Sequence, residues 1–320
     1  MNAKISEILI SSPFDSNLLN ACMKSENIHA GEESIMASII SHAIVTNNVN
    51  LLNTIKIPSY AVIKSKVGNA YTLIQGNFCD SIWKCIPLQS HEILSPEKQK
   101  RIPIIEAIDH IETYHCYISD LFLKFTKNIA FVDLKKDYLG KDTTITSSSF
   151  PLLPLTVFLS PKALKHIPPN TVSDMPSYRL LAENLLHEAI HQQVNLTLVE
   201  KDIFCAEYSS ELSPKIQIEW RKKQGIKRNQ AWELDRVLHA ITVYVNLVKF
   251  RRKEVVLFNT DNLISQYIKS SLPEGLDALD YLSKSLLLYK NFFTENGYDL
   301  VSELRKKALV EISKAKKLCY

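Results

Sequence analysis

Two histidines and a glutamate at helical spacing are the residues of this chain best placed for metal chemistry. They form the stretch His187-Glu188-Ala189-Ile190-His191. On a helix, positions i and i+4 lie one above the other on the same face, so both imidazoles can reach one ion. The glutamate between them points toward the same surroundings. The spacing therefore predicts a metal site at residues 187–191.

The segment that must position these ligands has the pattern of a long amphipathic helix, from residue 178 to residue 199. Its apolar residues recur at helical spacing: Leu180, Leu181, Leu185, Leu186, Ile190, Val194 and Leu198. Burial of this face would keep the surroundings of an ion dry and fix the geometry of its ligands. We therefore expect a buried metal-binding helix over residues 178–199.

Two imidazoles leave a catalytic metal site incomplete. Such sites take a third protein ligand and keep open positions for water or substrate. The downstream candidates are Glu207, Glu211, Glu233, Asp235 and His239. Glu207 or Glu233 would complete the ligand set of a zinc metallopeptidase, in which Glu188 is the general base on metal-bound water. This alternative stays open.

His239 is the third ligand that we favour on chemical grounds. It lies within an apolar helical segment, residues 230–251, where a neutral imidazole needs a polar partner. Arg236 lies one turn before it and Thr242 one turn after it. A cation and a hydroxyl beside a metal ligand suit a cosubstrate that carries a carboxylate. The alternatives are a hydrogen-bonded core histidine and an ion pair of Arg236 with Glu233.

Three stretches together resemble a known family. They are Ser147–Ser149 with the following strand 155–160, the segment 181–191, and the segment 236–240 that runs into Tyr244. The chain resembles the α-ketoglutarate-dependent HExxH-type peptide β-hydroxylases, which are bacterial proteins that modify ribosomally made peptides. The resemblance covers roughly residues 100–250.

One feature of the family's pattern differs in this chain. Family members carry an Arg-Pro pair shortly before the last histidine, whereas this chain has Trp232, Glu233, Leu234 and Asp235 there. The arginines that remain as substitutes for that residue are Arg221, Arg228 and Arg236.

The resemblance implies an Fe(II) oxygenase that uses 2-oxoglutarate and O₂. His187, His191 and His239 would hold the iron, and Glu188 would orient a ligand or bind as an additional one. The partner would be a precursor peptide, hydroxylated on a side-chain β-carbon. Zinc stays an alternative metal, because imidazoles suit both ions. A third hypothesis is a helical binding protein without enzymatic activity.

The patterning predicts a mainly α fold with small antiparallel β elements (α+β), and a metal site between two core helices. We expect a helical N-terminal region with a small β hairpin or sheet over residues 1–100, which is a candidate peptide-binding region. Residues 101–320 would form a mainly helical catalytic region. That region is expected to contain a helix at 104–127, strands at 128–134 and 155–159, and a serine-rich loop at 141–149.

Other histidines and segments are expected to be structural. His110 and His115 lie five residues apart on the predicted helix 104–127, so they should not share a face. A third strand is expected within residues 78–88. The six cysteines are scattered, without the Cys-x-x-Cys spacing of a structural zinc site.

Charge and hydropathy set the expected surroundings. A net charge of +4 gives no strong attraction to nucleic acid or to a membrane surface. The sequence contains no apolar run of about 18 residues and no signal-peptide pattern. We therefore expect a cytoplasmic protein with reduced thiols, and the oligomeric state stays open.

Overall fold

The computed structural model describes residues 28–46, 48, 51, 56–99, 103–139, 145–167, 171–220, 230–258 and 263–319. The predicted helices at the start of the N-terminal region lie outside these residues. The chain divides into two compact units, Met1–Leu196 and Thr197–Tyr320. Helices form 60% and strands 15% of the structure, which confirms the predicted mainly helical α+β fold.

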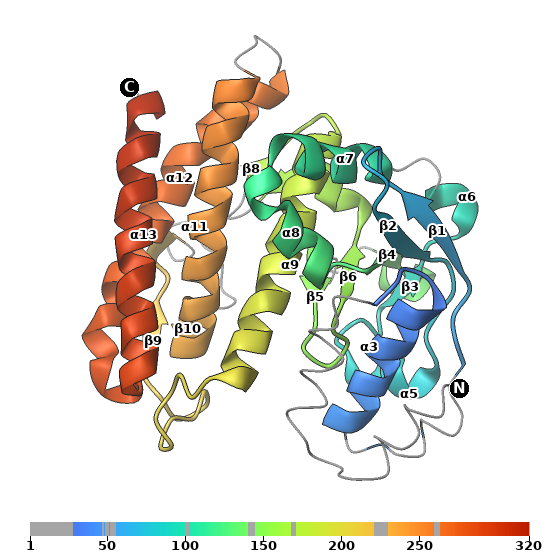
Figure 1. The fold of residues 1–320 in the computed structure, drawn as a ribbon, viewed down its shortest axis with the longest axis horizontal. Coiled ribbons are helices and arrows are strands. Elements are labelled where there is room, and N and C mark those ends of the chain that lie inside the picture. Colours follow the sequence, from blue (N-terminus) through green and yellow to red (C-terminus); the bar gives the residue numbers. More distant parts are fainter. Residues whose placement is uncertain are drawn as a thin grey trace. The chain divides into compact units, whose positions relative to one another are not determined.

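The first unit is built on a six-stranded mixed sheet (Figure 1). Its strand order is β1-β2-β4-β6-β5, with β3 paired to the far end of β4. The strands are β1 Tyr60–Lys64, β2 Ala70–Ile74, β3 His91–Ile93, β4 Asn128–Leu134, β5 Ser147–Ser149 and β6 Thr156–Leu159. The pairs β2–β4 and β4–β6 are parallel, and the remaining pairs are antiparallel.

The expected hairpin and the two later strands are present, but they belong to one sheet. The predicted domain boundary at residue 100 falls inside the first unit, because β2 and β3 precede it and both pair with β4. The prediction of a third strand within residues 78–88 is wrong, because that segment forms the short helix α5, Asp80–Cys85. Its Ile82 and Trp83 are buried in the core of this unit.

Helices cover both faces of the sheet. They are α3 Glu32–Val45, α5, α6 Pro96–Gln99, α7 Ile104–Tyr114, α8 Cys116–Phe125 and α9 Tyr178–Glu200. On one face, Ile35 and Ile39 of α3 join a core cluster with Ile74 and Phe158 of the strands. Short elements complete the unit: η1 Lys136–Tyr138, η2 Pro161–Leu164, β7 His166–Ile167 and β8 Thr171–Val172.

A buried row of polar side chains also joins α3 to the sheet. Thr72, Asn128 and Thr156 are register neighbours on β2, β4 and β6. The Asn128 amide donates to the Ser34 carbonyl and to the Ser38 hydroxyl, both at 3.0 Å, and its Oδ1 accepts from the Ser34 hydroxyl at 2.6 Å. Because buried amides and hydroxyls are costly unless they are bonded, this network fixes the position of α3 on the sheet.

The long helix expected over residues 104–127 is two helices. His115 separates α7 from α8 and has φ −122° and ψ 40°, outside the helical region. No proline or glycine marks this break in the sequence. After the break, α8 buries Ile118, Phe122 and Phe125, so tertiary contacts outweigh the continuous helical pattern.

The second unit is a helical bundle with a small hairpin. Its elements are β9 Lys215–Gln217, β10 Ala231–Glu233, α11 Leu234–Leu257, α12 Leu263–Leu286, η3 Leu287–Phe292 and α13 Glu295–Cys319. The predicted helix at 230–251 begins later, because Ala231–Glu233 pairs with β9 instead. No described helix combines the length and apolar character needed to cross a membrane.

Candidate metal site

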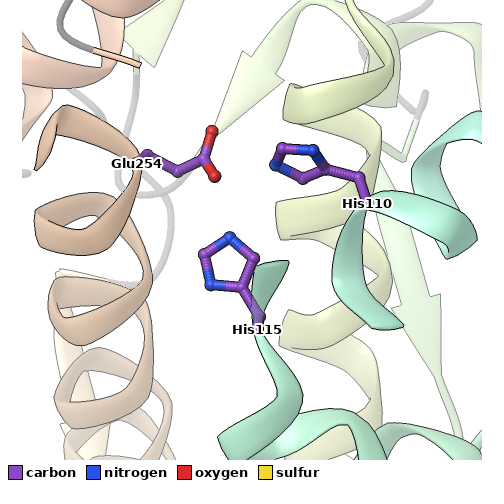
Figure 2. Close-up of side chains that lie close together, drawn as sticks. All are labelled: His110, His115 and Glu254. Carbon is purple, nitrogen blue, oxygen red and sulfur yellow. The ribbon is translucent and has the colours of Figure 1, made fainter. Parts of the chain in front are cut away.

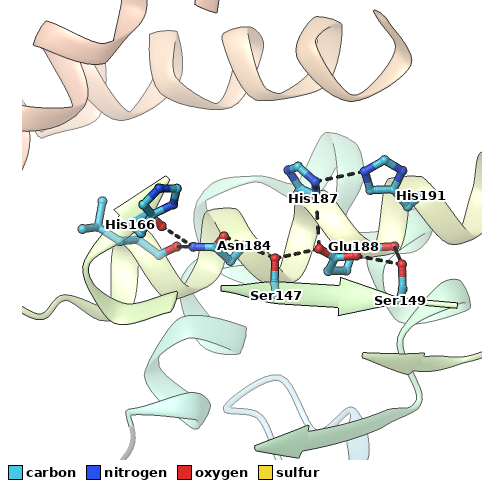
Figure 3. A network of polar contacts seen from close by, with 8 residues as sticks. Ser147, Ser149, His166, Asn184, His187, Glu188 and His191 are labelled. Atoms are coloured by element: carbon cyan, nitrogen blue, oxygen red, sulfur yellow. Dashed lines mark hydrogen bonds and ion pairs between the residues drawn. The ribbon is translucent and has the colours of Figure 1, made fainter. Parts of the chain in front are cut away.

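The helix that carries the histidine pair is α9, Tyr178–Glu200, as the sequence predicts. The Nε2 atoms of His187 and His191 point at one another across 2.9 Å (Figure 3). Two nitrogens that bind one ion at about 2.1 Å and at a right angle would be about 3.0 Å apart. The same separation suits a proton shared between two neutral rings. The spacing of the two nitrogens is therefore compatible with one divalent ion.

The Glu188 carboxylate is buried and held from the sheet. The Ser147 hydroxyl donates to Oε1 at 2.6 Å, and the Ser149 hydroxyl donates to Oε2 at 2.7 Å (Figure 3). Oε1 also lies 3.9 Å from Nε2 of His187. The side chain is 5% exposed, whereas that of His187 is 19% exposed. The glutamate thus lies behind the imidazole pair, with a serine on each oxygen.

Strand geometry explains how both serines reach this carboxylate. The prediction of a loop at Ser147–Ser149 is wrong, because the segment is edge strand β5, antiparallel to β6. Alternate residues of a strand face the same side, so Ser147 and Ser149 both face α9. Serine has little intrinsic preference for strands, so the pairing with β6 is what makes this segment a strand.

Asn184 extends the same network by one turn of α9. Its amide nitrogen lies 3.1 Å from the Ala163 carbonyl oxygen, 2.6 Å from that of His166 and 2.9 Å from that of Leu180, and these three acceptors share its two hydrogens. Its Oδ1 lies 3.5 Å from the Ser147 hydroxyl. Asn184 is not among the residues that the sequence predicts for the site, although an amide four residues before Glu188 on an apolar helix face is a usable signal, and the structure buries it.

The predicted third ligand, His239, lies on α11 in the second unit. It is half-buried, and burial lowers the pKa of its imidazole to about 4, against the opposing influence of Asp235. The ring is therefore neutral at pH 7, which is the form that binds metals. Asp235 is itself held by the hydroxyls of Tyr208, at 2.8 Å, and Ser210, at 2.9 Å.

The predicted cosubstrate residues flank His239 on α11. The Arg236 guanidinium lies 4.9 Å from the ring centroid of Trp232, which is a cation–π distance. The Thr242 hydroxyl donates to the Leu238 carbonyl at 3.0 Å, so its oxygen can still accept a bond. Arg221 and Arg228 lie outside the described residues.

The alternative glutamate ligands are exposed or paired with a lysine. Glu233 accepts a hydrogen bond from the Lys215 ammonium at 2.8 Å, and this bond lowers the pKa of Glu233. Glu207 and Glu211 are exposed. The structure thus groups the predicted residues in two sets: His187, Glu188 and His191 on α9, and Arg236, His239 and Thr242 on α11.

No family model matches this chain, and a search of curated proteins gave no match either. The resemblance to the peptide β-hydroxylases therefore stays a prediction from the motifs alone.

Proposed function

We propose that this protein is an Fe(II)- and 2-oxoglutarate-dependent oxygenase that hydroxylates a side-chain β-carbon in a ribosomally synthesised peptide. The proposal starts from the converging Nε2 atoms of His187 and His191. Bound Fe(II) would supply the activation of O₂, with 2-oxoglutarate as the co-reductant.

The observation that favours an oxygenase over a peptidase is the position of Glu188. A peptidase needs this glutamate as a general base on metal-bound water. Here the carboxylate is 5% exposed, and each oxygen accepts a serine hydroxyl at 2.6–2.7 Å. Such a carboxylate is suited to joining α9 to strand β5 behind the imidazole pair, whereas a general base must reach metal-bound water.

The remaining roles come from the sequence. His239 is proposed as the third ligand, and the lowered pKa of its imidazole keeps it in the neutral form. Arg236 would bind the distal carboxylate of 2-oxoglutarate, and Thr242 would accept or relay a hydrogen bond at the same group. A cytoplasmic location is part of the proposal, and the described cysteines Cys79, Cys85, Cys116 and Cys205 are free thiols.

Anaerobic optical titration tests this function. Fe(II) is added to the chelator-treated full chain without oxygen, 2-oxoglutarate follows, and the visible charge-transfer band of the chelate is recorded. The band should appear in the wild type and be lost in His187→Ala, His191→Ala and His239→Ala. His29→Ala is the matched control, because His29 is exposed and should leave the band unchanged.

Three results would change the proposal. A missing band with tight zinc binding, together with peptide cleavage that Glu188→Gln abolishes, would establish a zinc metallopeptidase. A band that persists in His239→Ala would move the third ligand elsewhere. No uptake of any metal by the wild type would leave a binding protein without a catalytic site.

A further inference from the structure

A second pair of histidines meets at the break between α7 and α8. His110 lies on the last turns of α7, and His115 is the residue that separates the two helices. Their ring centroids are 5.5 Å apart, and Figure 2 shows both imidazoles turned to the same side. On a continuous helix, residues five apart would diverge. The non-helical backbone of His115 is what brings its ring beside that of His110.

The burial and spacing of these rings suit a metal ion. His110 is 2% exposed and His115 is fully buried. One ring nitrogen of each lies within 4.8 Å of the other. Two nitrogens on one tetrahedral ion would be about 3.4 Å apart, which lies within this limit. Imidazole pairs bind divalent transition metals, and two imidazoles leave further positions for water or other ligands.

Three tyrosine rings lie beside the pair. Ring centroids of Tyr114 and Tyr178 lie 5.2 Å and 5.6 Å from that of His110, and the Tyr117 ring lies 6.0 Å from that of His115. Such a shell limits water and thereby strengthens the attraction between an ion and its ligands. The alternative role of the same rings is simple aromatic packing, which needs no ion.

We propose that His110 and His115 bind a second divalent transition-metal ion, separate from the pair on α9. Zn²⁺ is the probe ion, because imidazole nitrogen is among its usual ligands and it has no redox chemistry of its own. The ion would hold the α7–α8 break in its folded geometry. Metal binding of this kind adds to the free energy of folding, because the site is not formed in the unfolded chain.

The test measures metal stoichiometry on the full chain. The decisive variant is His187→Asn with His191→Asn, which removes the α9 pair but leaves His110 and His115 intact. After chelator treatment and titration with Zn²⁺, this variant should retain one tightly bound ion and show a higher unfolding temperature with Zn²⁺ than without. His110→Asn should bind one ion fewer than the wild type, whereas His29→Asn should bind as many as the wild type.

The outcomes separate this proposal from the proposed function. Retention of one ion without the α9 pair supports the second site, whatever happens at the first. If that variant binds no ion and its unfolding temperature does not respond to Zn²⁺, the second site is overturned, and the pair is aromatic packing only. If the wild type binds a single ion that is lost in His110→Asn but kept without the α9 pair, the proposed function fails and the second site stands.

Discussion

The Oγ of Ser147 lies 2.6 Å from Oε1 of Glu188, so edge strand β5 is joined to α9 between its two histidines. With Ser149 on the other carboxylate oxygen, the sheet fixes the rotation of α9 at the candidate metal site. Replacing both serines by alanine should leave a buried carboxylate without its donors. We expect metal affinity to fall roughly 10–100-fold, as for other groups that orient metal ligands. Titration with Fe(II) or Zn²⁺ measures this.

The control for the serine variants is Ser119→Ala. Ser119 donates only to the Cys116 carbonyl within α8. Its removal should leave the affinity unchanged. If the double serine variant and the control bind the metal with equal affinity, the hydrogen bonds to Glu188 do not help to position the two histidines.

The buried polar row between α3 and the sheet should dominate the stability of the first unit. Asn128→Leu removes an amide with at least four bonds and leaves Ser34, Ser38 and Thr156 without it. We expect a loss of about 2–4 kcal/mol in the free energy of unfolding, from the lost hydrogen bonds of the amide and the changed side-chain shape. Denaturant titration measures this loss.

Asn246→Leu is the control, because the amide of Asn246 donates only within α11, to Thr242. A cost for Asn128→Leu no larger than that of the control would contradict this account.

Two glycines of the second unit should respond differently to the same substitution. A Cβ at Gly297 would lie 1.9 Å from the carbonyl oxygen of Ile203, whereas a Cβ at Gly275 would lie 3.2 Å from Nη1 of Arg251. Backbone cannot yield as a long side chain does, so Gly297→Ala should cost more than about 2 kcal/mol and Gly275→Ala less than about 1 kcal/mol. Thermal unfolding of the two variants compares them, and a reversed order would show that Ile203 can move away.

Acid should destabilise the fold through its buried histidines. Burial lowers the pKa of His42 from 6.5, although its ring nitrogen Nδ1 lies 2.9 Å from the Leu152 carbonyl oxygen. The unfolded chain takes up this proton near pH 6.5, and the folded chain does so only at lower pH. The free energy of unfolding should therefore fall as the pH drops below about 6.5.

Urea titrations at about pH 7.5 and pH 5.5 check the sign of this pH dependence. The loss between the two values should be smaller in His42→Gln, which does not titrate, and unchanged in the exposed His29→Gln. Higher stability at the acidic value would mean that charged histidines are favoured in the folded protein.

The elements with a strong periodic signal were the ones that could be predicted. The pattern of α9 and the spacing of His187 and His191 predicted both the helix and the convergence of the imidazoles. The strands at 128–134 and 155–159 were likewise found from their apolar β-type residues. Their assembly into one mixed sheet depends on pairings between distant segments, which local patterns do not contain.

The features that were missed depend on tertiary contacts. Ser147–Ser149 reads as a loop, and only its pairing with β6 makes it a strand that faces Glu188. His115 breaks a helix without a glycine or proline, so the approach of its ring to His110 could not be foreseen from a spacing of five. The third ligand of the α9 site stays a prediction from the sequence.

Helix α9 also sets the distance between the two histidine pairs. Its first residue, Tyr178, contacts the His110 ring, and His187 follows nine residues later on the same helix. At 1.5 Å per residue, roughly 13 Å of helix separates the two positions. Ions in two-metal catalytic centres lie about 4 Å apart and share one substrate. Ions at the two histidine pairs would be too far apart to share a bridging ligand. Each ion would therefore bind and dissociate independently, with an affinity that does not depend on the other site.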